Sequence, residues 1–328
     1  MGEIGFSVVG LGMGASRARL ITETEGARLV SVVDLREDLA EKMGREFGCR
    51  WQTDLDDALN DDEVDVMFIL TPSGTHCDLV VRVLDAGKHA ISTKPMEVTV
   101  DRCDLMLEAQ QRSGKLLCID FERRFEDVHS KAKWAIENGR LGRLMMGEAR
   151  LKWFRDQEYY DAGGWRGTWK MDGGGALANQ TIHEIDLLRW LMGPPRTVTG
   201  RIAALNHKIE TEDLGVAIIE FESGAVGTIL GTTTFPVSDY QGLEVHGTEG
   251  AMISTGEEPR WIFSPGLEDR AESIERFAPY ENTIQNMVAA VRDGAPLICD
   301  GHEGRASVQI LNAVYESARD GSKPVKLG

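Results

Sequence analysis

Residues 4–15 read Ile4-Gly5-Phe6-Ser7-Val8-Val9-Gly10-Leu11-Gly12-Met13-Gly14-Ala15, and this stretch decides the fold. The apolar run over residues 5–9 predicts a buried strand, the glycines predict a tight turn, and residues 15–24 have a helical pattern. Gly10 allows the turn, and Gly12 lets the backbone approach a pyrophosphate at the positive end of the helix. We therefore expect Gly10, Gly12, Met13 and Gly14 to bind a dinucleotide, although a glycine turn between two core elements is the alternative.

The first 121 residues continue this alternation of strands and helices. Strands are predicted at residues 27–33, 65–70, 89–93 and 116–121, and helices at residues 36–47, 77–86 and 101–113. Continuous apolar runs such as residues 65–70 are typical of strands covered on both faces, as in parallel sheets. This part of the chain is therefore predicted to be a doubly wound α/β domain.

The pattern changes after about residue 121. Helices are predicted at residues 127–138, 176–192, 280–292 and 302–319, and strands at residues 144–153, 197–205, 214–221, 225–234, 243–246 and 251–254. Most of these strands follow one another without helices between them, which predicts an antiparallel sheet. We expect two domains, at residues 1–121 and 122–328. The apolar residues Ile218, Ile229 and Val245 indicate a sheet face that needs cover, and hence a homodimer or homotetramer.

Composition limits the partners and the compartment. The 328 residues include 36 basic and 53 acidic side chains, a formal net charge of −17. Such a balance argues against nucleic acid and anionic membranes as main partners. The five cysteines include no C-x-x-C pair, and no leader or membrane-spanning run is evident, so we expect a reducing, cytoplasmic location.

Polar residues at the predicted strand ends suggest how a cofactor is held. Asp34 ends the second strand and could accept hydrogen bonds from an adenosine ribose, which favours NAD over NADP, while nearby Arg36 weakens that preference. Thr71, Pro72 and His76 follow a buried strand, at the edge where cofactors lie in parallel sheets. For His76, capping or packing against the next helix is an equally good interpretation.

Two further motifs carry candidate chemistry. Lys94 precedes Pro95 at another strand end, where a lysine could bind cofactor and stabilise a developing alkoxide, although most such lysines are merely solvated. Asn179 and His183 are spaced i and i+4 in the predicted helix, so they share one face. The alternative for His183 is a core histidine above an apolar stripe. His183-x-x-Asp186 lacks a third ligand with motif spacing, so we expect no metal site.

Together these motifs resemble the Gfo/Idh/MocA family, the relatives of glucose-fructose oxidoreductase and inositol dehydrogenase. The resemblance extends over essentially the whole chain and rests on the following segments: residues 10–15, Thr71-Pro72 with His76, Lys94-Pro95, Arg124-Phe125, Trp165-Arg166, residues 173–186, Glu212-Asp213 and Ser223-Gly224. It implies a Rossmann domain followed by an α/β domain with an open antiparallel sheet. It also implies that Lys94 and His183 flank the substrate carbon that faces the nicotinamide.

The chain departs from the family pattern at two positions. Thr93 stands where a glutamate usually precedes the Lys-Pro pair, and Asn179 stands where an aspartate is common. Because Asn179 cannot act as a base, acid–base work is assigned to His183 with help from Lys94, while Asn179 orients the substrate. The Asn-Gln-x-Ile-His form also resembles the nucleotide-sugar 3-dehydrogenases. Trp165 and Arg124 are candidate substrate residues, with interface or core packing as the alternative.

The resemblance implies an oxidoreductase that moves a hydride between NAD(H) and a secondary alcohol or ketone of a sugar, glycoside, sugar derivative or cyclitol. One alternative is a glycoside hydrolase or lyase that retains NAD and acts by transient oxidation. Another is a non-catalytic sensor of NAD or a sugar. Net NADH release would distinguish the dehydrogenase from the first, and any turnover would exclude the second.

Overall fold

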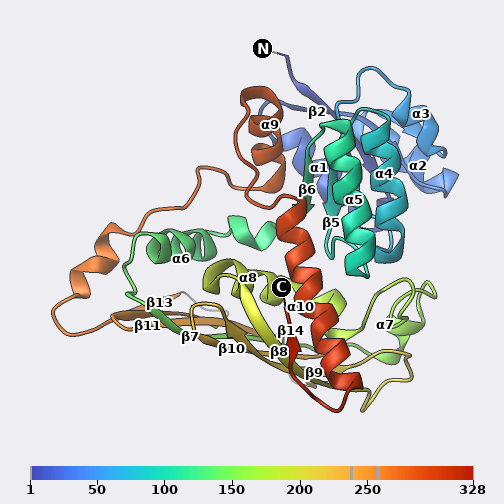
Figure 1. The fold of residues 1–328 in the computed structure, drawn as a ribbon. Coiled ribbons are helices and arrows are strands. Elements are labelled where there is room, and N and C mark those ends of the chain that lie inside the picture. The colour runs from blue at the N-terminus through green and yellow to red at the C-terminus, as the bar shows by residue number, and fades with distance from the viewer. Residues whose placement is uncertain (1, 237–238, 256–258, 328) are drawn as a thin grey trace. The chain divides into compact units, whose positions relative to one another are not determined.

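The computed structural model describes residues 2–236, 239–255 and 259–327, and it divides the chain into two compact units (Figure 1). The first unit comprises Met1–Glu122 and Tyr280–Arg305, and the second comprises Arg123–Pro279 and Ala306–Gly328. The observed division after Glu122 lies one residue from the predicted boundary. The prediction assigned all of residues 122–328 to one domain, whereas Tyr280–Arg305 packs with the first unit.

The first unit contains a six-stranded sheet with helices between the strands. Its strands are β1 (Ile4–Val9), β2 (Ala27–Val33), β3 (Arg50–Gln52), β4 (Val66–Ile69), β5 (His89–Thr93) and β6 (Leu117–Asp120). Its helices are α1 (Leu11–Glu23), α2 (Glu37–Phe47), α3 (Leu55–Leu59), α4 (His76–Asp85), α5 (Val100–Ser113) and α9 (Thr283–Asp293). Sequence analysis did not predict β3 or α3, which are only 3 and 5 residues long.

The strand order is β3-β2-β1-β4-β5-β6, and every neighbouring pair is parallel. All four residues of β4 are buried, because the strand is covered on both faces. The order reverses between β1 and β4, so their carboxyl ends form the switch point where ligands bind in such sheets. The predicted doubly wound α/β fold is confirmed.

Helix α9 completes the core of the first unit, although it comes from near the end of the chain. Its buried Ile284, Met287 and Val288 join the cluster that contains Phe6 and Phe68. Asn282 caps the helix by accepting the Gln285 N–H at 2.9 Å. The helix predicted at residues 280–292 is present as Thr283–Asp293, but the sequence could not indicate which sheet the helix covers.

The second unit is built on an eight-stranded sheet. Its strands are β7 (Leu144–Lys152), β8 (Pro195–Ala203), β9 (Leu214–Phe221), β10 (Val226–Thr232), β11 (Tyr240–Gly247), β12 (Gly250–Ser254), β13 (Arg260–Phe263) and β14 (Val325–Lys326). Its helices are α6 (Asp127–Glu137), α7 (Gln157–Asp161), α8 (Ile182–Met192) and α10 (Gly301–Arg319), of which residues up to Arg305 are grouped with the first unit. No helix among the described residues is long and apolar enough to cross a membrane.

The sheet order is β13-β12-β11-β7-β10-β9-β8-β14, and one pairing corrects the antiparallel prediction. Strands β7 and β10 are parallel, with Ala149 opposite Ile229. Parallel neighbours need a long crossover, and here it runs through α8, which packs on β7 and β10. Gly147 on β7 permits this close approach, because a Cβ there would lie 2.6 Å from Leu188 Cδ1 of α8.

The sheet has one covered face and one exposed face. Along β9, Ala217, Ile219 and Phe221 are buried, while Val216 is 41% and Ile218 51% exposed. This alternation also corrects our grouping of three apolar residues on one uncovered face. Ile218 lies on the exposed face, whereas the fully buried Ile229 and Val245 point to the covered face.

Candidate functional site

The glycine turn after β1 leaves its backbone open at the head of α1. Gly10 has φ +89°, and a Cβ there would lie 2.7 Å from the Leu70 carbonyl oxygen, so the β1–β4 switch point requires glycine. At Gly12 a Cβ would meet nothing within 4 Å. The exposed turn therefore has room for a phosphate beside the N–H groups of the first helical turn.

Gly14 has a different task from Gly12. A Cβ at Gly14 would lie 3.0 Å from Val8 Cγ1 of β1, so this glycine allows α1 to pack closely on the sheet. Met13 is 67% exposed beside the open turn. The close helix–strand contact is thus made at Gly14, one position before Ala15, where the motif usually has its third glycine.

Asp34 holds the glycine turn and a neighbouring arginine together. Its Oδ2 accepts the Leu11 N–H at 2.8 Å, and its Oδ1 accepts the Arg36 backbone N–H at 2.9 Å and Nε at 3.1 Å. Although partial burial raises the pKa of Asp34, these donors outweigh it and hold that pKa below its ordinary value. Arg36 Nη2 also donates to Oδ2 at 3.3 Å, so the ionised carboxylate, whose oxygens have two lone pairs each, can accept a ribose hydroxyl only in exchange for one of these donors.

His76 links the loops that follow β4 and β5. The imidazole is fully buried, with Nε2 at 2.8 Å from the Thr71 carbonyl oxygen and Nδ1 at 3.0 Å from that of Pro95. Burial lowers the pKa of His76, against the opposing effect of these carbonyls and Glu97. This geometry favours the packing interpretation: His76 positions Thr71 and Pro95. Its direct contact with a cofactor stays a prediction.

Lys94 lies directly after β5 and is half-buried, with a cis peptide bond to Pro95. The loop behind it is fixed by Glu97, which sequence analysis missed. The Glu97 carboxylate is fully buried and accepts the N–H groups of Cys77 at 2.7 Å and Val98 at 2.9 Å. The strand-end lysine is thus carried by a loop whose backbone is held at several points.

In the second unit, the predicted helix over residues 176–192 is interrupted. Ala176–Gln180 forms a π-helical turn, and α8 begins only at Ile182. The Thr181 N–H and hydroxyl both donate to the Ala176 carbonyl, at 2.9 and 2.8 Å, which closes the wider turn. The α-helical i, i+4 spacing that we predicted for Asn179 and His183 is therefore wrong. Single π-helical turns are frequent at functional sites.

Asn179 and His183 are nevertheless two of the three half-buried polar residues of this segment. From Asp172 to Met192, every residue is buried except the half-buried Asn179, His183 and Arg189. The Asn179 Nδ2 donates to Asp172 Oδ1 at 2.8 Å, and Asp172 Oδ2 accepts the Gly167 N–H at 2.8 Å. Asp172, which sequence analysis missed, thus orients the Asn179 amide and ties it to the Trp165–Gly167 loop.

The two other predicted substrate residues have different surroundings. Trp165 is half-buried, with the Arg166 guanidinium 5.0 Å from its ring centre, so it remains a surface candidate. Arg124 is 1% exposed and forms a bidentate pair with Asp186, from Nε at 2.7 Å and Nη2 at 2.6 Å. Because its charge is already matched inside the second unit, Arg124 belongs to the core, as the alternative interpretation held.

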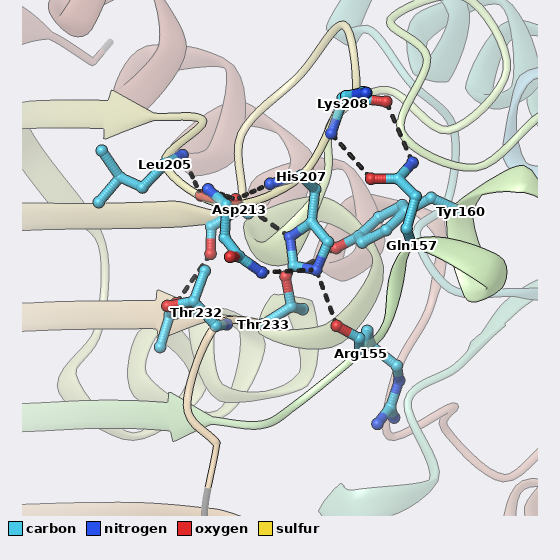
Figure 2. Close-up of polar contacts among 11 residues, drawn as sticks. Arg155, Gln157, Tyr160, Leu205, His207, Lys208, Asp213, Thr232 and Thr233 are labelled. Carbon is cyan, nitrogen blue, oxygen red and sulfur yellow. Dashed lines mark hydrogen bonds and ion pairs between the residues drawn. The ribbon is translucent and has the colours of Figure 1, made fainter.

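Two consecutive buried carboxylates, Glu212 and Asp213, precede β9, and no role was predicted for them from the sequence. Asp213 accepts the N–H groups of Leu205, Asn206 and His207, at 2.8, 2.8 and 2.9 Å. Figure 2 shows the His207 ring between Asp213 and the Arg155 carbonyl, at 3.0 and 2.7 Å. Burial raises the pKa of Asp213, but these donors outweigh it and leave that pKa lowered.

Glu212 has the opposite electrostatic balance. Its Oε1 accepts the N–H groups of Gly175 at 3.0 Å and Leu177 at 2.9 Å and the Tyr315 hydroxyl at 3.0 Å. Complete burial outweighs these donors and raises the pKa of Glu212 to about 7. Two neighbouring carboxylates, both fully buried, therefore differ in charge state near neutral pH. Within the described ranges, no group of three acidic, histidine or cysteine residues could hold a metal ion.

Two family models match the chain. One is described as an oxidoreductase family with an NAD-binding Rossmann fold and matches residues 4–121. The other is the GFO/IDH/MocA C-terminal domain and matches residues 129–253. The open turn at Gly12 and the ionised Asp34 fit such a dinucleotide, so the predicted NAD cofactor is confirmed.

Named relatives match along nearly the full length. The scyllo-inositol 2-dehydrogenase (NAD(+)) of Bacillus subtilis is 27% identical, covering 99% of this chain and 96% of that protein. The inositol 2-dehydrogenase of Rhizobium meliloti is 28% identical, covering 96% and 97%. The structure of the WlbA dehydrogenase from Bordetella pertussis, in complex with NADH and UDP-GlcNAcA, has a TM-score of 0.92 at 32% identity, covering 100% of this chain and 98% of that chain.

Proposed function

The chain belongs to the Gfo/Idh/MocA family of oxidoreductases, and from this premise we propose that it transfers a hydride between NAD(H) and a secondary alcohol or ketone of a sugar, sugar derivative or cyclitol. The relatives support this substrate class, since two act on inositols and a third is in complex with UDP-GlcNAcA.

Residues of the first unit would hold the cofactor. The amides around Gly12 at the start of α1 suit a pyrophosphate, the Asp34 carboxylate suits the adenosine ribose, and Thr71 and Pro72 lie at the neighbouring strand end. When bound, NAD supplies the hydride acceptor. The proximity of Arg36 to Asp34 neutralises part of the carboxylate charge, so we propose a preference for NAD rather than strict exclusion of NADP.

The proton is handled by residues of this chain. We assign His183 as the base that takes the proton of the substrate hydroxyl, because Asn179 cannot ionise. Lys94 would donate a hydrogen bond to the same oxygen and stabilise the negative charge that develops on it. The Asn179 amide, held by Asp172, would orient the substrate.

One observation carries the chemical part of this proposal. In the otherwise buried segment from Asp172 to Met192, Asn179 and His183 are two of the three residues that are only half-buried. A histidine that served the core alone would be buried with its neighbours. The partial exposure of His183, together with a neighbouring amide oriented by a buried carboxylate, supports a role in binding and proton transfer.

The experiment is a turnover assay. The purified protein is incubated with NAD or NADP and a panel of scyllo-inositol, myo-inositol, glucose and UDP-GlcNAcA, and NADH is followed by absorbance. We expect net NADH formation with at least one compound, faster with NAD than with NADP. Conversion of a glycoside without net NADH would identify the hydrolase or lyase alternative, and binding of NAD without any turnover would identify a sensor.

The exposed sheet face also supports a proposal about assembly. Val216 and Ile218 on β9 and Val226 on β10 are 41%, 51% and 42% exposed on the same face, which is more apolar surface than isolated residues explain. We propose a homodimer or homotetramer that covers this face and acts in the cytoplasm. Light scattering at micromolar concentration would show a stable monomer if this is wrong, and Ile218→Asp should shift the mass downward if it is right.

A further inference from the structure

Glu212 accepts hydrogen bonds from three consecutive backbone amides at the start of the π-helical turn. Its Oε1 accepts the N–H groups of Gly175 and Leu177, at 3.0 and 2.9 Å, and its own carbonyl oxygen accepts that of Ala176 at 2.9 Å. The first amides of a helix have no partner within the helix. Here one residue, distant in sequence and fully buried, provides acceptors for all three.

Gly174 and Gly175, which precede the turn, leave the space that this contact needs. A Cβ at Gly175 would lie 2.0 Å from the Glu212 carbonyl oxygen, and a Cβ at Gly174 would lie 1.9 Å from the Tyr315 hydroxyl. Gly175 itself has φ −121° and ψ −107°. Neither glycine is near an open surface, so their small size serves the approach of Glu212 and Tyr315 and leaves no room for a ligand.

The amides held by Glu212 are connected by hydrogen bonds to the residues assigned to the substrate. The Asn179 N–H donates to the Gly175 carbonyl at 3.0 Å, and Thr181 donates to the Ala176 carbonyl through its N–H at 2.9 Å and its hydroxyl at 2.8 Å. Helix α8, which carries His183, begins immediately afterwards. A shift at residues 175–177 would therefore be passed to both Asn179 and His183.

We propose that Glu212 is a positioning residue, which fixes the π-helical turn through three amides and thereby aligns Asn179 and His183 with the substrate. This inference rests on the proposed function, because it assigns Glu212 an effect on that reaction. Misplacing a reacting group by about 1 Å can cost roughly 100-fold in rate. Glu212 touches neither substrate nor cofactor in this role and acts only through the backbone.

The charge state of Glu212 should change the strength of these hydrogen bonds. An ionised carboxylate forms stronger hydrogen bonds to N–H groups than a neutral acid does, and burial brings its proton equilibrium close to neutral pH. Oε2 has no hydrogen-bond partner among the described residues. Tyr315 and Tyr160 interact electrostatically with Glu212. Asp172 and Arg319 in turn act on Tyr315, and Asp213 acts on Tyr160.

The first test compares three variants in the full-length protein. Glu212→Ala removes the acceptor, Glu212→Gln keeps an acceptor oxygen but cannot ionise, and Glu222→Gln makes the same change at an exposed hairpin turn. With the substrate that the turnover assay identifies, we expect Glu212→Ala to lower kcat about 10- to 100-fold, with Kd for NAD unchanged. We expect Glu212→Gln to restore most of kcat and to flatten its pH profile near pH 7, while Glu222→Gln matches the wild type.

The second test does not depend on turnover. In ¹⁵N–¹H spectra, the Gly175 and Leu177 amides should titrate together near pH 7 in the wild type and in Glu222→Gln, but not in Glu212→Gln. Tyr315→Phe removes a donor to Glu212 and should raise the midpoint of that titration. The His183 ring resonance, assigned by its loss in His183→Asn, should shift in Glu212→Ala and return in Glu212→Gln.

These outcomes separate the two proposals. If no compound in the panel is turned over, the proposed function fails, while the amide titration still tests whether Glu212 holds the turn. Wild-type kcat in Glu212→Ala would overturn the positioning role. The positioning role would also be overturned if the amide resonances of Gly175 and Leu177 did not change with pH in the wild type. The same holds if the His183 ring resonance were unchanged in Glu212→Ala.

Discussion

The two units each contain a glycine turn ahead of a helix. The two turns differ in whether the space next to their backbone is open or filled by protein atoms. At Gly12 a Cβ would meet nothing within 4 Å, so the first turn is open to a ligand. At Gly174 and Gly175 a Cβ would lie 1.9 and 2.0 Å from protein atoms, so the second turn is filled by the protein itself. In the first turn a carboxylate, Asp34, takes one amide. In the second, Glu212 takes three.

The comparison shows that a glycine run before a helix does not by itself predict a binding site. Small residues let something approach the backbone closely, but the local sequence does not say whether that is a ligand or another part of the chain. In the second turn the partner is Glu212, which follows Gly175 by a long stretch of chain. In our proposals the first turn binds the cofactor, and the second positions the side chains that come after it.

The largest effect should come from His183→Asn, which tests whether the second turn serves chemistry. Loss of a general base typically lowers turnover roughly 10²–10⁴-fold, while NAD affinity should hold because the first turn is intact. The measurements are kcat per folded molecule and Kd for NAD. His246→Asn, on β11 of the same unit, is the matched control. A variant with a normal rate and a lowered melting temperature would show that His183 belongs to the core.

Gly175→Ala and Gly12→Ala test whether one turn is filled and the other is open. At Gly175 the new methyl group would collide with the Glu212 backbone, so the free energy of unfolding should fall by about 3 kcal/mol. At Gly12 there is space, so stability should be unchanged or slightly higher, because alanine is the better helix former, and NAD affinity should fall instead. Chemical denaturation and NAD titration of both variants provide the measurements. Equal stability losses would contradict the assignment of one open and one filled turn.

The pH dependence of stability should differ between the two turns. The pKa of Glu212 is raised to about 7, so between about pH 4.5 and 7 the folded state keeps a proton that the unfolded state has lost. The stabilisation from Glu212 is complete below pH 4.5 and disappears as pH rises from 4.5 to 7, a loss of about 3 kcal/mol. Asp34, whose pKa is lowered, contributes above its unfolded pKa and loses this only as the solution becomes strongly acidic.

Denaturation at several pH values checks these signs. Glu212→Gln should flatten the decline in unfolding free energy between pH 4.5 and 7, and Glu222→Gln should leave it unchanged. A wild-type protein whose stability rises over that range through Glu212 would contradict the raised pKa.

The smallest effect concerns cofactor choice at the first turn. Asp34→Ala should reduce the preference for NAD over NADP about tenfold, because it removes a ribose acceptor and a repulsive charge. It also releases Arg36, which then faces a 2′-phosphate. Fluorescence titration with NADH and NADPH measures the ratio, with Asp38→Ala as a control for the loss of an exposed carboxylate. An unchanged ratio would show that Asp34 serves the turn alone.

The sequence allowed most of the first unit to be predicted because its signals are local. The strand over residues 5–9, the turn at Gly10 and the apolar run over residues 65–70 each depend on neighbours along the chain. The features that were missed depend on distant partners. The amides at the start of the π-helical turn are bound by Glu212, the parallel β7–β10 pair requires a crossover through α8, and Arg124 is buried because Asp186 matches its charge.

The site residues follow the same division. Gly10, Gly12 and Asp34 could be assigned from motif spacing, since the strand–turn–helix fixes their geometry within one segment. Asp172 could not, because its importance appears only when Asn179 and Gly167 are both within hydrogen-bonding distance. For His76 the structure adds a packing role, since each ring nitrogen lies next to a loop carbonyl, while its contact with a cofactor stays a prediction.

The return of Tyr280–Arg305 to the first unit has a consequence for synthesis on the ribosome. The chain passes between the units three times, after residues 122, 279 and 305. Ile284, Met287 and Val288 fill part of the same core as Phe6 and Phe68, so the six strands emerge long before their last covering helix. Domains generally fold from the N-terminus as they are made, yet this nucleotide-binding unit must wait, with an apolar patch exposed, until the chain is nearly complete. A fragment truncated at Glu122 would keep that patch permanently.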